Sequence, residues 1–177
     1  MKATRARKYS MVAVWAVAVV ALLLGSLPSG AGAASSGRSH TATSKDWTVT
    51  IWVARTSTKA GTSIPATVTV DNRLDHRVDI TGCPGTDYEI VAGNSKVPNN
   101  PVIPTVFCSS KMGPGIHIFH TKVQTMYQVC GGGEGTPPCG NPPKMSPLPV
   151  GTYHTQLILP GASPSLPTPR ALTITLT

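Results

Sequence analysis

The stretch WTVTIWV at residues 47–53, followed by IPATVTV at residues 64–70, decides the fold class. Apolar and polar residues alternate through both stretches, so that every second side chain lies on the same face of an extended chain. Such a period of two is typical of a β-strand with one buried face. Pro65 has no backbone N–H group, which places it at a strand start or a sheet edge. Both stretches are therefore predicted to be half-buried strands.

Shorter extended segments follow these two strands, and turn-forming residues separate them. Residues 34–177 show no helical period of about 3.6 residues. Many short strands divided by turns are typical of an all-β, antiparallel β-sandwich, and about seven or eight strands are expected. The further strands are predicted at residues 77–81, 88–91, 105–108, 116–129, 152–159 and 170–177.

The predicted strand at residues 116–129 changes the parity of its alternation. Ile116 and Ile118 share one face, whereas Phe119 and the apolar residues after it share the other. A β-bulge near Phe119 would bring both sets to the same side of a sheet, and we expect a bulge or bend there.

Two tryptophans, Trp47 and Trp52, fall on opposite faces of the first strand. One of them is expected in the core. The other is either covered by the residues that precede the strand or exposed as a binding anchor, because Trp is enriched at interface hot spots.

The first 33 residues have the pattern of a secretory signal peptide. Four basic residues precede an uncharged apolar run at residues 11–24, and small residues then lead to Ala31-Gly32-Ala33. The apolar run is shorter than the roughly 20 residues that a membrane-spanning helix needs. Cleavage after Ala33 is therefore expected, and an uncleaved N-terminal anchor is the alternative. The protein is then secreted or extracytoplasmic, in the cell envelope, with no stable membrane span after cleavage.

Three segments are expected along the chain. Residues 1–33 form the signal peptide helix, residues 34–46 a flexible leader, and residues 47–177 one sandwich domain. The leader is rich in Ser, Thr and Gly and has no apolar periodicity. The part of the chain that follows the signal segment is long enough for one domain with its own core.

The charge of the chain is concentrated at its start. Four of the fifteen basic residues lie in residues 1–33, so that residues 34–177 carry eleven basic and seven acidic side chains, a formal charge of +4. A small positive charge favours solubility and weak attraction to anionic envelope polymers. The basic residues are scattered and not interleaved with aromatic residues, which argues against nucleic acid as a partner.

All four cysteines, Cys83, Cys108, Cys130 and Cys139, follow the signal segment. An even number of cysteines in an exported chain is typical of disulfide bonds. Their spacing is longer than in metal sites of the C-x-x-C kind. Of the three possible pairings, Cys83–Cys108 with Cys130–Cys139 is favoured, because each pair brackets a segment rich in Pro or Gly.

The segment LPVGTY at residues 148–153 resembles the loop-to-strand corner of immunoglobulin-like and fibronectin-like domains. With GTSIPATVTVDN at residues 61–72, it makes residues 47–177 similar to small exported immunoglobulin-like domains of actinobacteria, mostly of unassigned function. The resemblance implies an immunoglobulin-like sandwich in which Tyr153, two residues after Gly151, bonds back to the preceding backbone. Thr155 stands where true immunoglobulin domains have a cysteine, so that the usual inter-sheet disulfide is not expected.

Residues 130–150 are the candidate for recognition. CGGGEGTPPC at residues 130–139 predicts a loop closed at its neck, and prolines continue it to residue 150. Loops at the ends of sandwiches often carry binding, and a disulfide with prolines lowers the entropy cost of holding one shape. A rigid insertion that only resists proteolysis is the alternative. The residues expected to make contact are Gly131, Gly132, Gly133, Glu134, Pro137, Pro138, Pro142, Pro143 and Lys144.

Three histidines, His117, His120 and His154, are weak candidates for a copper or zinc site. On a regular strand His117 and His120 point to opposite faces, so that they would share a metal only across the expected bulge. Solvated strand histidines are the favoured interpretation, and no metal or cofactor is predicted.

Catalytic groups are not evident in the sequence. Asp75 beside His76 fits a turn, in which Asp caps its own backbone, and Asp87 with Glu89 fits a solvated strand face. No motif presents a nucleophile beside a base, so that the chain is not expected to be an enzyme.

These observations predict an exported, non-catalytic binding domain that recognises a protein or an envelope polymer through its end loops. One alternative is a proteinase inhibitor that inserts the stapled loop into a protease cleft. The other is a periplasmic-type copper- or zinc-binding protein.

Overall fold

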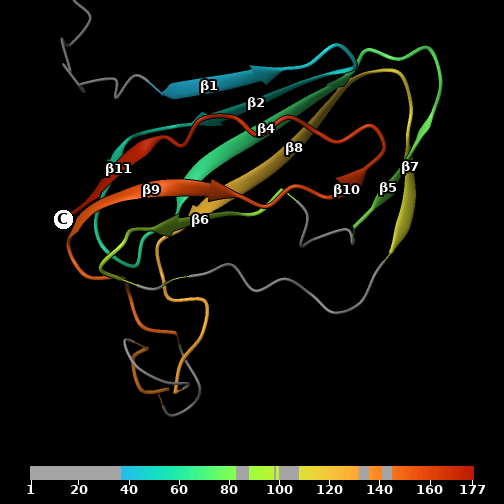
Figure 1. Cartoon of the computed structure of the whole chain (residues 1–177). Coiled ribbons are helices and arrows are strands. Elements are labelled where there is room, and N and C mark those ends of the chain that lie inside the picture. Colours follow the sequence, from blue (N-terminus) through green and yellow to red (C-terminus); the bar gives the residue numbers. More distant parts are fainter. Residues whose placement is uncertain (1–36, 83–87, 98, 100–107, 132–135, 141–144) are drawn as a thin grey trace, which may run out of the picture. The chain divides into compact units, whose positions relative to one another are not determined.

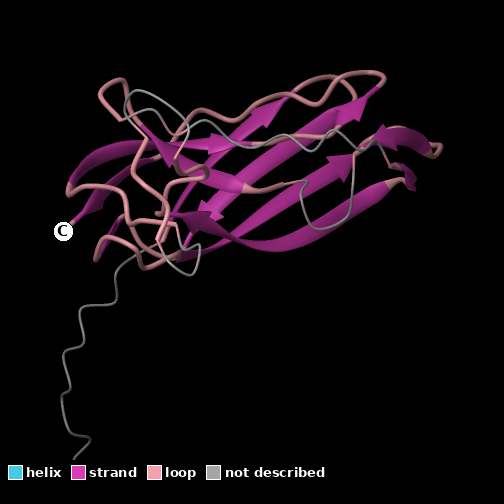
Figure 2. Cartoon of the chain, turned by 90° about the horizontal axis from the view of Figure 1, so that it is seen from below, coloured by secondary structure: helices cyan, strands magenta, loops and turns pink. Residues whose placement is uncertain are grey.

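The structure is a computed structural model that describes residues 37–82, 88–97, 99, 108–131, 136–140 and 145–177. All regular structure in these residues is β, as predicted, and no described residue is helical (Figures 1 and 2). Eleven strands lie in two sheets, which is consistent with a β-sandwich. The prediction of about seven or eight strands was too low, because three short strands at sheet edges have no clear apolar alternation.

The larger sheet contains eight strands: β1 (Arg38–Thr43), β2 (Trp47–Val53), β3 (Ser57–Thr58), β4 (Ile64–Asn72), β6 (Ile90–Gly93), β8 (Gly115–Gln124), β9 (Gly151–Leu157) and β11 (Thr173–Leu176). Their order is β1-β2-β4-β8-β6-β9-β11-β3. Neighbouring strands are antiparallel, except that β6 runs parallel to β8 and β3 runs parallel to β11. Pro65 is the second residue of β4, near the strand start where it was expected.

The smaller sheet has three strands in the order β10-β5-β7. Their bounds are β5 (Val78–Thr81), β7 (Ser109–Met112) and β10 (Gly161–Ala162). β7 begins directly after the strand predicted at residues 105–108, of which residues 105–107 lie outside the described part of the chain. A tight connection at residues 113–114 then leads from β7 into β8.

One hydrophobic core draws residues from both sheets. Every second residue of β2 and β4 is buried, as their alternation predicted. The same cluster includes residues of β6, β9 and β11, with contributions from β5 and β7, so that strands distant in the order share one core. The largest fully buried side chains include Trp47, Tyr153, Ile64, Ile90, Leu148 and Ile174.

The two tryptophans of β2 have different surroundings. Trp47 is fully buried, and its Nε1 donates a hydrogen bond to the carbonyl oxygen of Pro164 at 2.9 Å. Trp52 on the opposite face is 41% exposed. Its indole lies against Gly37, where an added Cβ would stand 2.6 Å from Nε1. The preceding residues therefore cover part of the Trp52 ring and leave the rest at the surface.

A strand occupies much of the segment that was expected to be a flexible leader. β1 pairs with β2 along its whole length, and the Thr41 and Thr50 hydroxyls lie 2.9 Å apart. The inward residues of β1 include His40 and Ala42, which are only half-buried. The expectation of a flexible segment at residues 34–46 is therefore corrected for residues 38–43, which backbone pairing orders without an apolar face.

The bulge predicted near Phe119 is absent, and this expectation was wrong. β8 pairs with β4 in one continuous register, from Gly115 opposite Asn72 to Val123 opposite Ile64. Phe119 therefore faces the core side of the sheet, whereas Ile116 and Ile118 face outward. Ile116 and Ile118 are apolar although they are exposed. The alternation of apolar residues therefore did not mark the buried face at this end of β8.

Candidate functional site

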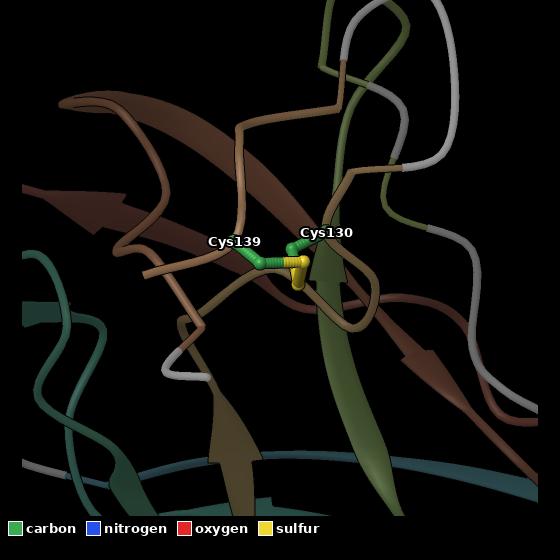
Figure 3. The surroundings of a disulfide bond; sticks show 2 residues. All are labelled: Cys130 and Cys139. Atoms are coloured by element: carbon green, nitrogen blue, oxygen red, sulfur yellow. A yellow bond between two sulfur atoms is a disulfide. The ribbon is translucent and has the colours of Figure 1, made fainter. Parts of the chain in front are cut away.

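A disulfide between Cys130 and Cys139 closes the neck of the loop (Figure 3). Their Cα atoms lie 4.9 Å apart, and this predicted pairing is confirmed. Inside the neck, the N–H group of Gly131 donates to the carbonyl oxygen of Pro137 at 2.8 Å. Gly131 has a φ of +69°, a conformation that glycine adopts without strain. The described part of the loop is thus fixed by one covalent bond and one hydrogen bond.

Several predicted site residues lie outside the described part of the chain. These are Cys83, Gly132, Gly133, Glu134, Pro142, Pro143 and Lys144. Cys108, which was expected to pair with Cys83, is disulfide-bonded. Among the predicted contact residues that are described, Pro138 is exposed and Pro137 is half-buried.

The base of the loop is held by an antiparallel ladder between its two limbs. The N–H group of Tyr127 donates to the carbonyl oxygen of Ser146 at 2.9 Å, and that of Leu148 donates to Thr125 at 3.0 Å. An isolated bridge lies between these two bonds. Leu148 is 1% exposed and belongs to the core, so that the returning limb is anchored by packing as well. Figure 1 shows the described parts of this segment, in gold and orange, running past the ends of β6 and β9.

A buried asparagine joins the outgoing limb to β6. The side-chain Nδ2 of Asn99 donates to the carbonyl oxygen of Ala92, and its Oδ1 accepts a hydrogen bond from the N–H group of Gln128, both at 2.8 Å. Asn99 is 3% exposed, and a buried amide of this kind is costly to leave without partners. Sequence reasoning missed Asn99, because one asparagine in an irregular segment has no periodic or spacing signal.

Tyr153 fixes the returning limb where it enters β9. Its hydroxyl donates to the carbonyl oxygen of Pro149 at 2.8 Å, a bond of the kind that the resemblance implied. Gly151 between them has a φ of +153°, which favours glycine. Burial raises the pKa of the Tyr153 hydroxyl, and the nearby Tyr127 raises this pKa further. The hydroxyl therefore remains protonated, and able to donate, at neutral pH.

A cavity of about 600 Å³ opens beside the base of the loop. One wall is the turn that leads into β4, where Gly61 comes so close to Pro147 that an added Cβ would stand 3.1 Å from the proline Cγ. The lining includes Met126 and Met145 from the two limbs and Lys59 from the turn. The cavity thus combines flexible apolar side chains with one cation.

Three large apolar side chains are exposed on or beside this loop. Val129 is 41% exposed, Met145 is 38% exposed and Val150 is 71% exposed. Val129 and Met145 belong to opposite limbs above the ladder. Exposed apolar groups on a fixed loop are the kind of surface that a partner covers on binding.

The three predicted metal candidates do not come together. His117 donates from Nε2 to the carbonyl oxygen of Gly113 at 2.9 Å, whereas His120 is exposed on the other face of β8. His154 lies on β9, and β6 separates β9 from β8 in the sheet. Within the described ranges, no group of three or more His, Cys, Asp or Glu side chains could hold a metal ion.

The remaining titratable pairs lie apart from the loop. His76 and Asp75 are both largely exposed and lie 2.9 Å apart between Nδ1 and Oδ1. The hydrogen bond from His76 lowers the pKa of the Asp75 carboxyl. Asp87 lies outside the described residues, and Glu89 lines a second cavity of about 690 Å³ together with His120.

Comparison with known proteins gives no relative. No family model matches the chain, and no curated protein or solved structure matches it either.

No helix in the described ranges is long and apolar enough to cross a membrane.

Proposed function

We propose that this chain is an exported, non-catalytic binding domain of the immunoglobulin-like sandwich type. Its contact surface is the stapled loop, defined as residues 128–145, with Val129 on its outgoing limb and Met145 on its returning limb. The partner is a protein or an envelope polymer, and the surface chemistry favours a protein.

The observation that carries this proposal is that both limbs of the stapled loop are fixed at the base. Asn99 holds one limb, Tyr153 and Leu148 hold the other, and Cys130 with Cys139 closes the neck. A loop that is ordered before it binds loses less conformational entropy when it meets a partner. These bonds hold the base of an exposed loop, which supports a role in recognition.

The chemistry of the surface supports a protein partner. Val129 and Met145 offer apolar contact area on the two limbs. The adjoining cavity, lined by Met126, Met145 and Lys59, suits an apolar side chain near a carboxylate. Methionine adapts its shape to varied partners more readily than branched residues do.

Export is supported by the pattern of residues 1–33 and by the disulfide chemistry of the chain. Disulfide bonds persist in oxidising compartments and are rare in the cytosol. Both Cys108 and the Cys130–Cys139 pair are oxidised. N-terminal sequencing of the exported protein tests the expected cleavage after Ala33.

Binding is tested with the full chain, produced in a host that exports it. The protein serves as bait in a cell-envelope extract, the captured species is identified, and its affinity is then measured with purified components. We expect Val129→Asp and Met145→Asp to weaken this affinity at least about tenfold, because each places a charge in the apolar contact. Thr50→Asp, on an outward face of β2 and away from the loop, is the matched control and is expected to bind normally.

A captured partner whose affinity is equal for all three variants would contradict the stapled loop as the contact surface. The rigidity of the loop also fits a proteinase inhibitor, which presents a fixed loop to a protease cleft. Saturable inhibition of a protease that is lost when the loop is cut would assign the protein to that class instead.

A further inference from the structure

The cavity of about 690 Å³ lies beside β8, at the point where β6 begins to pair with it. The two strands pair only at Val123 and Gln124 of β8, and no described strand pairs with this edge at residues 116–120, the open edge of β8. Glu89 directly precedes β6 and Lys122 directly precedes Val123, and both side chains line the cavity. The volume lies in the range of cavities that hold small molecules.

A stacked aromatic pair forms one wall of this cavity. The rings of Tyr88 and Phe119 have centroids 3.8 Å apart and planes inclined by 15°. Tyr88 has a φ of +64°, and it is the one non-glycine residue with a positive φ in the described part of the chain. Its N–H group donates to the carbonyl oxygen of Ile158 at 2.9 Å, which holds this conformation. Backbone conformations that are costly for a bulky residue are concentrated at functional sites.

Two opposite charges line the cavity without neutralising each other. The carboxylate of Glu89 and the ammonium group of Lys122 form no ion pair within the described ranges, and neither side chain makes a hydrogen bond there. A comparable pair in the smaller sheet differs, because Asp79 and Lys111 lie opposite each other in β5 and β7 and join at 3.5 Å. Glu89 is half-buried, and a charge that is partly removed from water gains from a partner of opposite charge. Both charges are therefore available to a ligand.

The rest of the lining has a polar part and an apolar part. His120, Thr121 and Gln124 supply hydrogen-bonding groups, and none of these side chains has a partner among the described residues. Ile118 is 58% exposed and Phe119 is half-buried, so that apolar contact area is accessible. A few polar groups that converge beside apolar surface are typical of sites for small molecules.

We propose that this cavity binds a small zwitterion, an amino acid or a dipeptide with an apolar side chain. The ammonium group of the ligand meets Glu89, its carboxylate meets Lys122, and its apolar side chain lies against Ile118 and Phe119. Opposite charges on the two sides of the cavity select a ligand that carries both, because each charged group then finds its complement. The cavity shares no residue with the stapled loop, so that this inference does not depend on the partner proposed there.

Isothermal titration calorimetry of the full exported chain tests the ligand class. The probes are phenylalanine and the dipeptide phenylalanyl-leucine, and each is compared with its N-acetyl form, which lacks the ammonium group, and with its amide form, which lacks the carboxylate. We expect one-to-one binding of a free zwitterion and at least about tenfold weaker binding of both blocked forms, because each loses one charged contact. The two probes show whether the amino acid or the dipeptide fits. Failure of both to bind saturably, or equal binding of the blocked forms, would overturn the proposal.

Two substitutions assign the charged contacts to the cavity. Glu89→Gln is expected to weaken binding of the zwitterion at least about tenfold and to remove its advantage over the N-acetyl form, because both then lack the same contact. Lys122→Gln is expected to do the same with respect to the amide form. Asp79→Asn and Lys111→Gln are the matched controls, since they remove the same charges from the exposed pair in the smaller sheet, and normal binding is expected. Equal affinity in all four variants, or a loss in the controls as well, would refute this cavity as the site.

Discussion

The side-chain Oδ1 of Asn99 accepts a hydrogen bond from the backbone N–H group of Gln128, 2.8 Å away, across 29 residues of sequence. The same side chain donates to Ala92 in β6. This one amide therefore connects the sheet to the outgoing limb of the stapled loop.

Replacement of Asn99 by alanine is expected to lower the free energy of unfolding by about 2 kcal/mol, because the half-buried N–H of Gln128 and the buried C=O of Ala92 lose the amide that bonds them. Denaturant unfolding measures the loss, and hydrogen exchange at the Gln128 amide is expected to accelerate. Asn94→Ala is the control, because Asn94 bonds the backbone of Lys96 and Val97 at the surface, where water replaces it. Equal losses for both variants would contradict the role assigned to Asn99.

Tyr153→Phe removes the hydroxyl that donates to Pro149 and leaves the ring in place. We expect a loss of about 1 kcal/mol in the free energy of unfolding, with an unchanged denaturant slope. An unchanged stability would show that the hydroxyl bond does not hold the returning limb.

The stability of the protein is expected to fall at alkaline pH through Tyr153. Burial raises the pKa of this hydroxyl in the folded state, so that the unfolded chain loses the proton at a lower pH. The contribution is fully present below the unfolded value of about 10 and is lost as the pH rises toward the folded value. Unfolding followed from neutral to alkaline pH is expected to show a steeper decline for the unmodified protein than for Tyr153→Phe. Parallel declines would contradict this assignment.

Removal of the staple with Cys130→Ser and Cys139→Ser is expected to lower the free energy of unfolding by about 2–3 kcal/mol, because the unfolded chain regains the freedom of a short closed loop. The ladder at the base contains no cysteine and is expected to remain. Limited proteolysis is therefore expected to cut first within residues 130–139. A first cut elsewhere in the chain would show that the staple is not what protects this loop.

Gly61 is required for the turn that lines the loop cavity. Its φ is +80°, and an added Cβ would stand 3.1 Å from Pro147. Gly61→Ala is expected to cost about 1–2 kcal/mol of stability, because an L-residue is disfavoured in this conformation. Gly113→Ala is the control, since its added Cβ has no neighbour within 4 Å. It is expected to leave stability unchanged or to raise it by up to about 1 kcal/mol.

The strands that the sequence predicted best are those with one buried face. β2 and β4 alternate because every second residue enters the core, which makes the period visible in the sequence. β1 was not predicted, because backbone pairing with β2 holds it in place and no buried apolar face marks it in the sequence. Ile116 and Ile118 led to the wrong prediction of a bulge near Phe119, because they are apolar without being buried.

The candidate site was predictable only where it depends on local chemistry. The spacing of Cys130 and Cys139, with the Gly and Pro residues between them, predicts a closed loop, and the disulfide confirms it. The bond between Asn99 and Gln128 depends on how distant segments meet, and no local pattern encodes such a meeting. The same holds for the open edge of β8, which exists because β6 pairs with so little of it.

The position of β11 has a consequence for how the chain is made. β11 lies between β9 and β3, and Leu172, Ile174 and Leu176 are buried in the core. The core therefore cannot close until β11 has been synthesised and has paired with β9 and β3. Closure of the core is therefore a late step of folding, because it needs a strand that follows β9 and β3 in the chain but lies between them in the sheet.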